Sequence, residues 1–588
     1  MIRSVRRRRR TTLGLLVTAG ALLVSTGCAS IPVASPPQVI PQSVPAAAPA
    51  GGDIRYDGIV PRPGEAPEDV VRDFLRAGGS TERAHTRARA YLTPAASKHW
   101  NDNAGALIIE NSFYVDTQQG DSIRKLSAQR HGRINEDGSY VPSEGAFNHL
   151  FHLTKVDGEW RIDNPPQGLL IELSTFESAY RPYDVYFLNS GESKVVPDVR
   201  WYAAPPDSLA TLLVTALEHG PSKWLADAVS NDLTGVTLES NIVQEPDRVK
   251  VFLTGLGDQE DTLPAGGFAQ LVWTLSQIGV GAVEVYSDRQ LIRPPKSPDL
   301  TLQQLKNWQG FAPDNLSVNA SGYFIRDGAV WTTTKDAPLA GPAGRNSFGA
   351  VSVAASVDES SVAVVQRTPA GGSVLYVGAP GSLRPTVSAA TLTRPTWGSG
   401  IREVWTVRDA RDVLLVTVDG HAYPVEVPQA QQIGPIRALS LSRDGARVAV
   451  VAGAAGRERL WIGVVARENG AQIQGLRPLD VGDTPVSDVS WSDAGTVVAL
   501  TRSGEQDSSL YSIDVDGGSP AVLVSTAGLP GPPTAVAAGP ALLTIAAGTL
   551  WRTPVASESW TRVEDRRGGE SAPAPTHRRS LSDRWSDR

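Results

Sequence analysis

The chain has 588 residues, of which 41% are apolar and 20% charged, and its formal net charge is −7. This length predicts about three or four domains, each with its own core. Six arginines fall within residues 1–27, so the rest of the chain is more negative still, which disfavours nucleic-acid binding. The only cysteine, Cys28, excludes an internal disulfide bond and a thiolate metal cluster.

Residues 1–27 have the pattern of an export signal peptide. Arginines precede an apolar run, Leu13 to Val24, that is too short to span about 30 Å of hydrocarbon. The sequence Ser25-Thr26-Gly27-Cys28 then resembles a bacterial lipobox, although Ser25 stands where a leucine-like residue is usual. The resemblance implies cleavage before Cys28, a diacylglycerol thioether on its sulfur and an acyl group, such as palmitate, on its nitrogen. An ordinary secretory signal with a chance cysteine is the alternative.

Lipidated Cys28 opens a proline-rich tether, residues 28–52, with six prolines between positions 32 and 49. Two or more acyl chains hold a protein stably on a bilayer, so we predict a protein anchored to the cell membrane on its extracytoplasmic face. Proline keeps such a segment extended. At the opposite end, residues 564–588 are charged and proline-bearing, which is typical of a disordered tail.

Residues 53–178 have the pattern of a small α+β domain. Glu68-Asp69 begin an amphipathic helical run, strands follow, and Asp157-Gly158 mark a hairpin turn. This order, with helices before a curved antiparallel sheet, resembles NTF2-like domains, whose cone can house an active site. The candidates there are His149 and His152. A strand places them on opposite faces, so we expect structural histidines and not a metal pair.

Residues 180–292 form the next unit, with strands predicted at 184–188, 248–253 and 282–286 and helices at 208–217 and 268–278. The sequences LEHGP (217–221), QLVWTL (270–275) and VEVY (283–286), in this order and spacing, resemble the GerMN domain. That resemblance brings no catalytic residue. Gly220-Pro221 are interpreted as a helix stop.

Residues 314–563 change to short apolar strands that repeat. Strand–turn–strand copies at 351–365, 438–451 and 489–500 are each followed by a strand with an aromatic residue, and weaker copies begin near 395 and 534. Spacings of about 40 to 50 residues are typical of propeller blades. We predict an all-β propeller of five or six blades. Residues 316–334 can share a blade with the last strands and so close the ring.

The whole order of segments resembles the LpqB lipoprotein family of actinobacteria. It implies a multidomain fold with an NTF2-like α+β domain, a GerMN domain and a β-propeller. It also implies an accessory role: contact with the extracytoplasmic domain of a sensor histidine kinase of the MtrB type. Through the MtrA–MtrB two-component system this contact would affect the cell envelope and division. The resemblance implies no cofactor.

An enzyme is the main alternative class. The chain has no HExxH helix, no GxSxG elbow and no phosphate loop, and acidic pairs such as Glu260-Asp261 lie in capping or loop contexts. We therefore predict no enzymatic activity and no metal, although a glycan or ester hydrolase stays open because glycosidase carboxylates can be distant in sequence. A binder of cell-wall fragments or peptides would need exposed aromatics around a pocket. Four tryptophans fall instead within the strand pattern: Trp397, Trp461, Trp491 and Trp551.

Overall fold

The computed structural model describes residues 60–563 except for 81–82, 257–262, 315–321, 334, 400–401, 505–506, 519, 540 and 555–558. Several predictions fall outside the described residues: the signal peptide predicted for residues 1–27, Cys28 and the tether predicted for residues 28–52, the Glu260-Asp261 pair, and the tail predicted for residues 564–588. Within the described part, no helix is both long enough and apolar enough to cross a bilayer.

The N-terminal region, residues 60–180, is a mixed α/β unit in which helix α2 (Pro67–Gly78) packs on a seven-stranded sheet. The strand order is β6-β5-β3-β1-β7, with β2 and β4 also paired to β3. Strand β7 runs parallel to β1 and the other neighbours are antiparallel. The elements are β1 (Ala106–Ile109), β2 (Tyr114–Gln119), β3 (Ile123–Ile134), β4 (Tyr140–Pro142), β5 (Ala146–Val156), β6 (Glu159–Ile162), β7 (Leu169–Glu172), α3 (Thr86–Arg89), α4 (Pro94–His99) and α5 (Leu173–Ala179).

Local chemistry explains the ends of these elements. Glu68 and Asp69 occupy the first turn of α2, where negative charge complements the helix dipole. The predicted hairpin turn between β5 and β6 is present, with positive φ at both Asp157 and Gly158. The apolar face of α2 lies over a core that includes Phe74, which contacts the rings of Trp100 and Phe151.

The middle region, residues 181–312, has two small sheets around helices α6 (Pro206–His219) and α7 (Ala265–Ser276). The first sheet has the order β10-β8-β9, and the second has the order β11-β13-β14-β15 with β12 paired to β13. Both sheets and both helices share one apolar core. The strands are β8 (Arg181–Asn189), β9 (Val195–Tyr202), β10 (Val229–Ser230), β11 (Thr237–Leu238), β12 (Val243–Gln244), β13 (Val249–Thr254), β14 (Val283–Ser287) and β15 (Gln290–Leu291).

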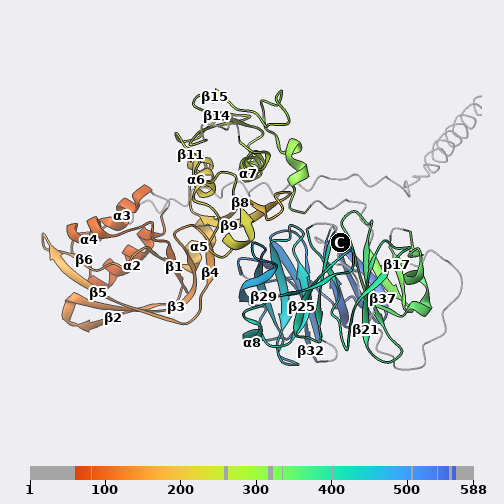
Figure 1. The fold of residues 1–588 in the computed structure, drawn as a ribbon. Coiled ribbons are helices and arrows are strands. Elements are labelled where there is room, and N and C mark those ends of the chain that lie inside the picture. Colours follow the sequence, from red (N-terminus) through yellow and green to blue (C-terminus); the bar gives the residue numbers. More distant parts are fainter. Residues whose placement is uncertain are drawn as a thin grey trace, which may run out of the picture. The chain divides into compact units, whose positions relative to one another are not determined.

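Six sheets follow one another in the C-terminal region, residues 322–563, and lie side by side in Figure 1. The first has three strands, β16 (Tyr323–Arg326), β17 (Ala329–Thr332) and β18 (Ala337–Pro338). The other five have four strands each: β19 (Ala350–Ala355), β20 (Val362–Arg367), β21 (Ser373–Gly378), β22 (Arg384–Ala389); β23 (Thr396–Trp397), β24 (Glu403–Arg408), β25 (Asp412–Thr417), β26 (Ala422–Val425); β27 (Ile436–Leu441), β28 (Arg447–Ala452), β29 (Arg459–Ala466), β30 (Gln472–Leu479); β31 (Val486–Trp491), β32 (Thr496–Ser503), β33 (Asp507–Asp514), β34 (Ala521–Val524); β35 (Pro533–Ala537), β36 (Ala541–Ala546), β37 (Thr549–Pro554), β38 (Thr561–Arg562).

Burial on both faces explains why these strands read as apolar runs. Every residue of β28 is buried, because its sheet packs between two neighbouring sheets. Stacked sheets of this kind cover one another's faces, as the blades of a propeller do. The multidomain class with a C-terminal propeller is confirmed.

One detail of the predicted ring closure was wrong. In the described residues, β16 to β18 form a sheet of their own and do not pair with the last sheet, β35 to β38. The two sheets meet through side chains instead: Phe324 and Trp331 pack with Ile545 and Leu550. Face packing buries apolar surface without a shared strand, and sequence periodicity does not distinguish these two arrangements.

Candidate functional site

The two histidines singled out from the sequence lie on β5, on opposite faces as predicted. His149 is half-buried and its ring lies 4.6 Å from that of Phe151, while His152 is exposed. His149 Nε2 lies 3.1 Å from the carbonyl oxygen of Asn164, and burial lowers the pKa of His149. Among the described residues, no group of three or more His, Cys, Asp or Glu is placed to hold a metal ion.

The four tryptophans of the strand pattern are packing residues to different degrees. Trp397 and Trp491 are buried, whereas Trp461 and Trp551 are half-buried. Trp491 also donates from Nε1 to the carbonyl oxygen of Ser440, 3.0 Å away on the neighbouring sheet. Three of them, Trp397, Trp461 and Trp491, pack in the apolar clusters between sheets, and none of the four lines either of the two cavities described below.

A cavity of about 890 Å³ is the strongest candidate site. Its wall comes from all three regions: the β3–β4 turn of the N-terminal region, β9 and the segment after α6 in the middle region, and propeller residues including Arg447 and Arg477. A second cavity of about 850 Å³ lies beside it and shares lining residues such as Tyr202 and Leu212. We call the contacts around the first cavity the junction.

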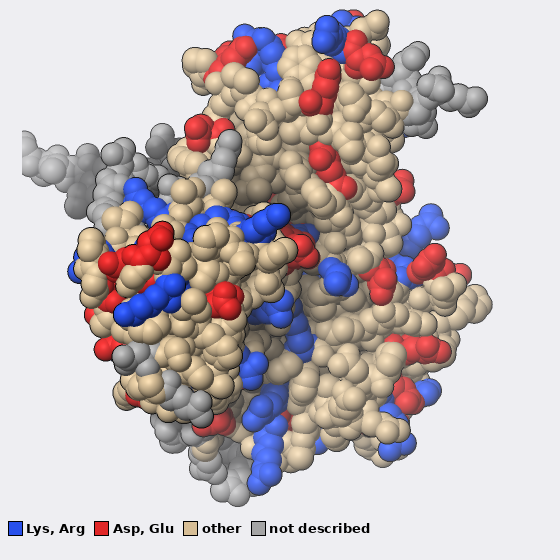
Figure 2. Space-filling view, turned by 90° about the vertical axis from the view of Figure 1, so that its left-hand side faces the viewer, with Lys and Arg blue, Asp and Glu red and all other residues tan. Residues whose placement is uncertain are grey.

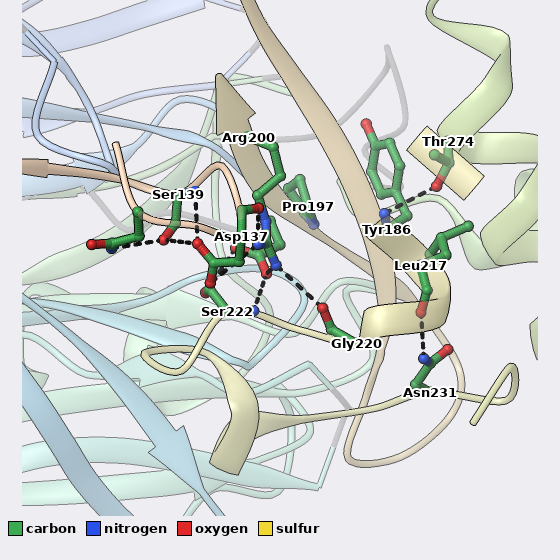
Figure 3. Close-up of polar contacts among 12 residues, drawn as sticks. Asp137, Ser139, Tyr186, Pro197, Arg200, Leu217, Gly220, Ser222, Asn231 and Thr274 are labelled. Carbon is green, nitrogen blue, oxygen red and sulfur yellow. Dashed lines mark hydrogen bonds and ion pairs between the residues drawn. The ribbon is translucent and has the colours of Figure 1, made fainter. Parts of the chain in front are cut away.

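Arg200 is the centre of the junction (Figure 3). It lies on β9, its side chain is 1% exposed, and its Nη2 donates to Asp198 Oδ2 at 2.7 Å. Its Nη1 donates to the carbonyl oxygen of Asp137, 2.6 Å away on the β3–β4 turn. Asp198 also accepts from the backbone N and the Oγ of Ser222, at 2.6 and 2.9 Å. The ion pair with Asp198 lies within β9, and the hydrogen bond from Arg200 to Asp137 joins the N-terminal and middle regions.

The β3–β4 turn is shaped for this contact. Gly138 has a φ of +83°, and a Cβ there would lie 2.8 Å from the ring of Tyr202, so this position requires glycine. The Gly138 carbonyl accepts from the backbone N of Trp201 at 2.8 Å. The turn and β9 therefore approach closely enough for direct backbone hydrogen bonding.

The propeller joins the same site through side chains. Trp201 Nε1 donates to Asp516 Oδ2 at 2.7 Å, and Arg447 Nη1 donates to the carbonyl oxygen of Pro197 at 3.1 Å. Arg447 is also paired with Asp444 at 2.9 Å, and both side chains are buried. Asn189 Nδ2 donates to the carbonyl oxygen of Asp444 at 2.9 Å. Polar contacts from β8 and β9 therefore fix the middle region on the propeller.

Sequence reasoning did not single out Asp198, Arg200 or Trp201, because it did not predict β9. The available signal was the alternation in residues 195–202, where Asp198 and Arg200 fall two apart and so share one face of a strand. Gly220, at the end of α6 with a φ of +87°, is the predicted helix stop. It also has a second role, since its carbonyl accepts from Arg200 Nη2 at 3.3 Å.

Asp184 on β8 gives this side of the molecule a pH dependence. Burial raises the pKa of Asp184 to about 6, and Asp493 and Asp198 act in the same direction, while Arg447 and a hydrogen bond from Tyr186 oppose them. Tyr186 donates to Asp184 Oδ2 at 3.3 Å. Between about pH 4 and this raised pKa, the folded state binds more protons at Asp184 than the unfolded state.

We therefore expect the Asp184→Asn substitution to stabilise the fold more at pH 7 than at pH 4. The direction of this effect follows from the raised pKa of Asp184. Wild type has its full stability below about pH 4 and loses part of it as the pH rises through about 6, where the buried carboxyl must ionise. Asparagine keeps an acceptor for Tyr186 without the charge, and the gain at pH 7 should be about 1–2 kcal/mol after allowance for partial exposure. Denaturant unfolding at both pH values measures this. Asp299→Asn, at an exposed position, is the control, and an equal gain at both pH values would contradict the assignment.

The fold and the junction define a multidomain protein in which a β-propeller is joined to two smaller α/β units. Comparison with protein families agrees region by region. Residues 60–177 match the model "Lipoprotein LpqB, N-terminal domain", residues 184–291 match "Sporulation and spore germination", and residues 328–575 match "Lipoprotein LpqB beta-propeller domain". The chain belongs to the LpqB lipoprotein family.

Full-length relatives support this assignment. The chain is 28% identical to lipoprotein LpqB of Rhodococcus jostii over 545 residues, 86% of this chain and 87% of that protein. It is 29% identical to LpqB of Nocardia farcinica (83% and 84%) and 29% identical to LpqB of Mycolicibacterium smegmatis (74% and 77%).

Solved propeller structures are more distant. The β-propeller domain of the Trilobed protease from Pyrococcus furiosus is 11% identical, covers 38% of this chain and 86% of its own, and gives a TM-score of 0.26. The propeller domain of Cps50 (Swd1) from Myceliophteria thermophila is 12% identical, covers 35% and 65%, and also gives 0.26. The propeller assignment therefore rests on sheet order and on the family match.

Proposed function

We propose that this protein is a lipid-anchored, non-catalytic accessory protein that binds the extracytoplasmic domain of a sensor histidine kinase of the MtrA–MtrB type and modulates its signalling. The observation that carries the proposal is the junction. Two buried arginines join regions in it: Arg200 donates to the Asp137 carbonyl and Arg447 donates to the Pro197 carbonyl. Each arginine also forms an ion pair inside its own region, with Asp198 and Asp444 respectively. Charged side chains used in this way favour a preformed binding surface over a catalytic centre.

A lipid anchor at Cys28 would bring the protein close to the extracytoplasmic domain of a membrane receptor. Acylated Cys28 would hold the chain on the outer face of the cell membrane, as the name lipoprotein implies for its relatives. The proline-rich tether, fully extended at about 3.1 Å per residue, would reach up to roughly 70 Å. That reach lets the folded part contact a receptor domain next to the bilayer.

Direct binding to the kinase tests the proposal. The mature chain and the isolated extracytoplasmic domain of the kinase are expected to co-purify, and to bind in biolayer interferometry with a Kd in the micromolar range or tighter. The extracytoplasmic domain of an unrelated kinase from the same cell is the matched control. No interaction at high micromolar concentration, or equal binding to both domains, would count against the proposal.

A further inference from the structure

Some of the cationic side chains that line the junction cavity have no ion-pair partner among the described residues. Five cationic side chains line it, and two of them, Arg200 and Arg447, are paired with Asp198 and Asp444. The remaining three make no ion pair within 4 Å among the described residues; they are Arg133, Lys223 and Arg477. Figure 2 shows Lys and Arg side chains gathered along a hollow on this side of the molecule. Four acidic side chains also line the cavity, Glu136, Asp137, Asp198 and Asp516. The feature that needs an explanation is therefore the set of cations without an ion-pair partner.

Of these three side chains, Arg477 is the least exposed. Its Nη2 donates to the carbonyl oxygen of Val515 at 2.8 Å, and its Nε is buried without a hydrogen-bond partner in the protein. Burial lowers the pKa of Arg477 to about 10, although Asp516 and Asp198 oppose the shift. Asp516 is already engaged, since it accepts from Trp201 Nε1 at 2.7 Å. A half-buried guanidinium with a buried Nε that has no hydrogen-bond partner, and with no ion pair of its own, favours an anion from outside.

The aromatic ring of Trp224 lies next to the Arg477 guanidinium. The Cζ atom of Arg477 lies 4.0 Å from the centre of the Trp224 ring. That ring is fixed, because Trp224 Nε1 donates to the carbonyl oxygen of Gly475 at 2.8 Å. The cation and the ring hold each other in place, so the guanidinium is oriented before any ligand arrives. Lys223, next in sequence to Trp224, is exposed and also lines the cavity.

We propose that the junction cavity binds a small ligand with an oxyanion group, a carboxylate or a phosphate. Arg477, Lys223 and Arg133 supply the positive charge, and Trp224 supplies an apolar wall. A volume of about 890 Å³ falls within the range of small-molecule sites, about 300–1,000 Å³. The guanidinium group suits this chemistry because its planar fork matches both carboxylate and phosphate oxygens. Because residues of all three regions line the cavity, an occupant would contact each of them.

Isothermal titration calorimetry on the full chain in detergent tests this site, with pyrophosphate as one probe and glutarate as the other at constant ionic strength. At least one probe should bind, and Lys223→Ala and Arg477→Gln should each weaken it about tenfold, the loss of one charge-assisted hydrogen bond. Lys98→Ala, an exposed lysine that does not line the cavity, should leave the affinity within twofold. Binding of pyrophosphate alone assigns a phosphate ligand, and binding of glutarate alone assigns a carboxylate.

Two results would overturn the proposal. One is that neither probe binds at millimolar concentration. The other is that Lys223→Ala binds as wild type does, since that exposed residue can be changed without loss of the fold. Comparison of thermal unfolding midpoints separates a true loss of affinity in Arg477→Gln from a loss of structure. Neither result bears on kinase binding, which is measured separately.

Discussion

Replacing Arg200 by methionine is expected to lower the free energy of unfolding by about 3–5 kcal/mol, because removal of one partner leaves a buried charge unpaired. Arg200 is 1% exposed and Asp198 is 7% exposed, so water cannot replace the lost guanidinium. The Asp137 carbonyl would lose its 2.6 Å donor and the Gly220 carbonyl its 3.3 Å donor. Methionine fills a similar volume, so the loss reports on the polar contacts and less on packing.

Amide hydrogen exchange shows which hydrogen bonds the Arg200→Met substitution weakens. The bond from the Trp201 amide to the Gly138 carbonyl joins the N-terminal and middle regions, so the Trp201 amide should lose protection in Arg200→Met before the propeller strands do. Arg408→Met is the matched control. It breaks a pair with Asp412 at 2.7 Å in which both side chains are more than 40% exposed, and it should cost about 0–1 kcal/mol. Equal costs for the two variants would show that the buried pair does not hold the junction.

Local sequence patterns predicted the propeller well because the physics of each blade is local. Strands buried on both faces read as apolar runs, as β28 does, and polar turns separate them. At the turn before β28, Ser442 Oγ donates to Asp444 and caps the bend. This combination of strand and turn repeats along the chain, so its period identifies the fold.

The junction could not be predicted in the same way. Its contacts join residues far apart in sequence, such as Trp201 with Asp516, which are 315 positions apart. Alternation across Asp198 and Arg200 is also what an ordinary half-exposed strand would show. Asp516 lies in a propeller turn segment and, taken alone, looks like a solvated acid. The parallel pairing of β1 with β7 could not be predicted either, because nothing in the sequence of either short strand specifies its partner.

The Cys28→Ser substitution is expected to move nearly all of the protein from the membrane to the soluble fraction. Acyl chains contribute about 0.8 kcal/mol for each CH₂ group buried in the bilayer, and serine cannot form the thioether that carries them. The folded part should keep its unfolding midpoint, because residue 28 lies before the described residues.

Membrane fractionation with fatty-acid labelling of the full-length chain in cells is the measurement that tests the anchored accessory protein most directly. Ser30→Ala, a change in the same tether that leaves Cys28 in place, is the control and should behave as wild type. We predict that wild type is labelled and sediments with the membrane, and that Cys28→Ser is unlabelled and soluble. If Cys28→Ser stayed membrane-bound with its label intact, the lipid anchor at Cys28 would be contradicted.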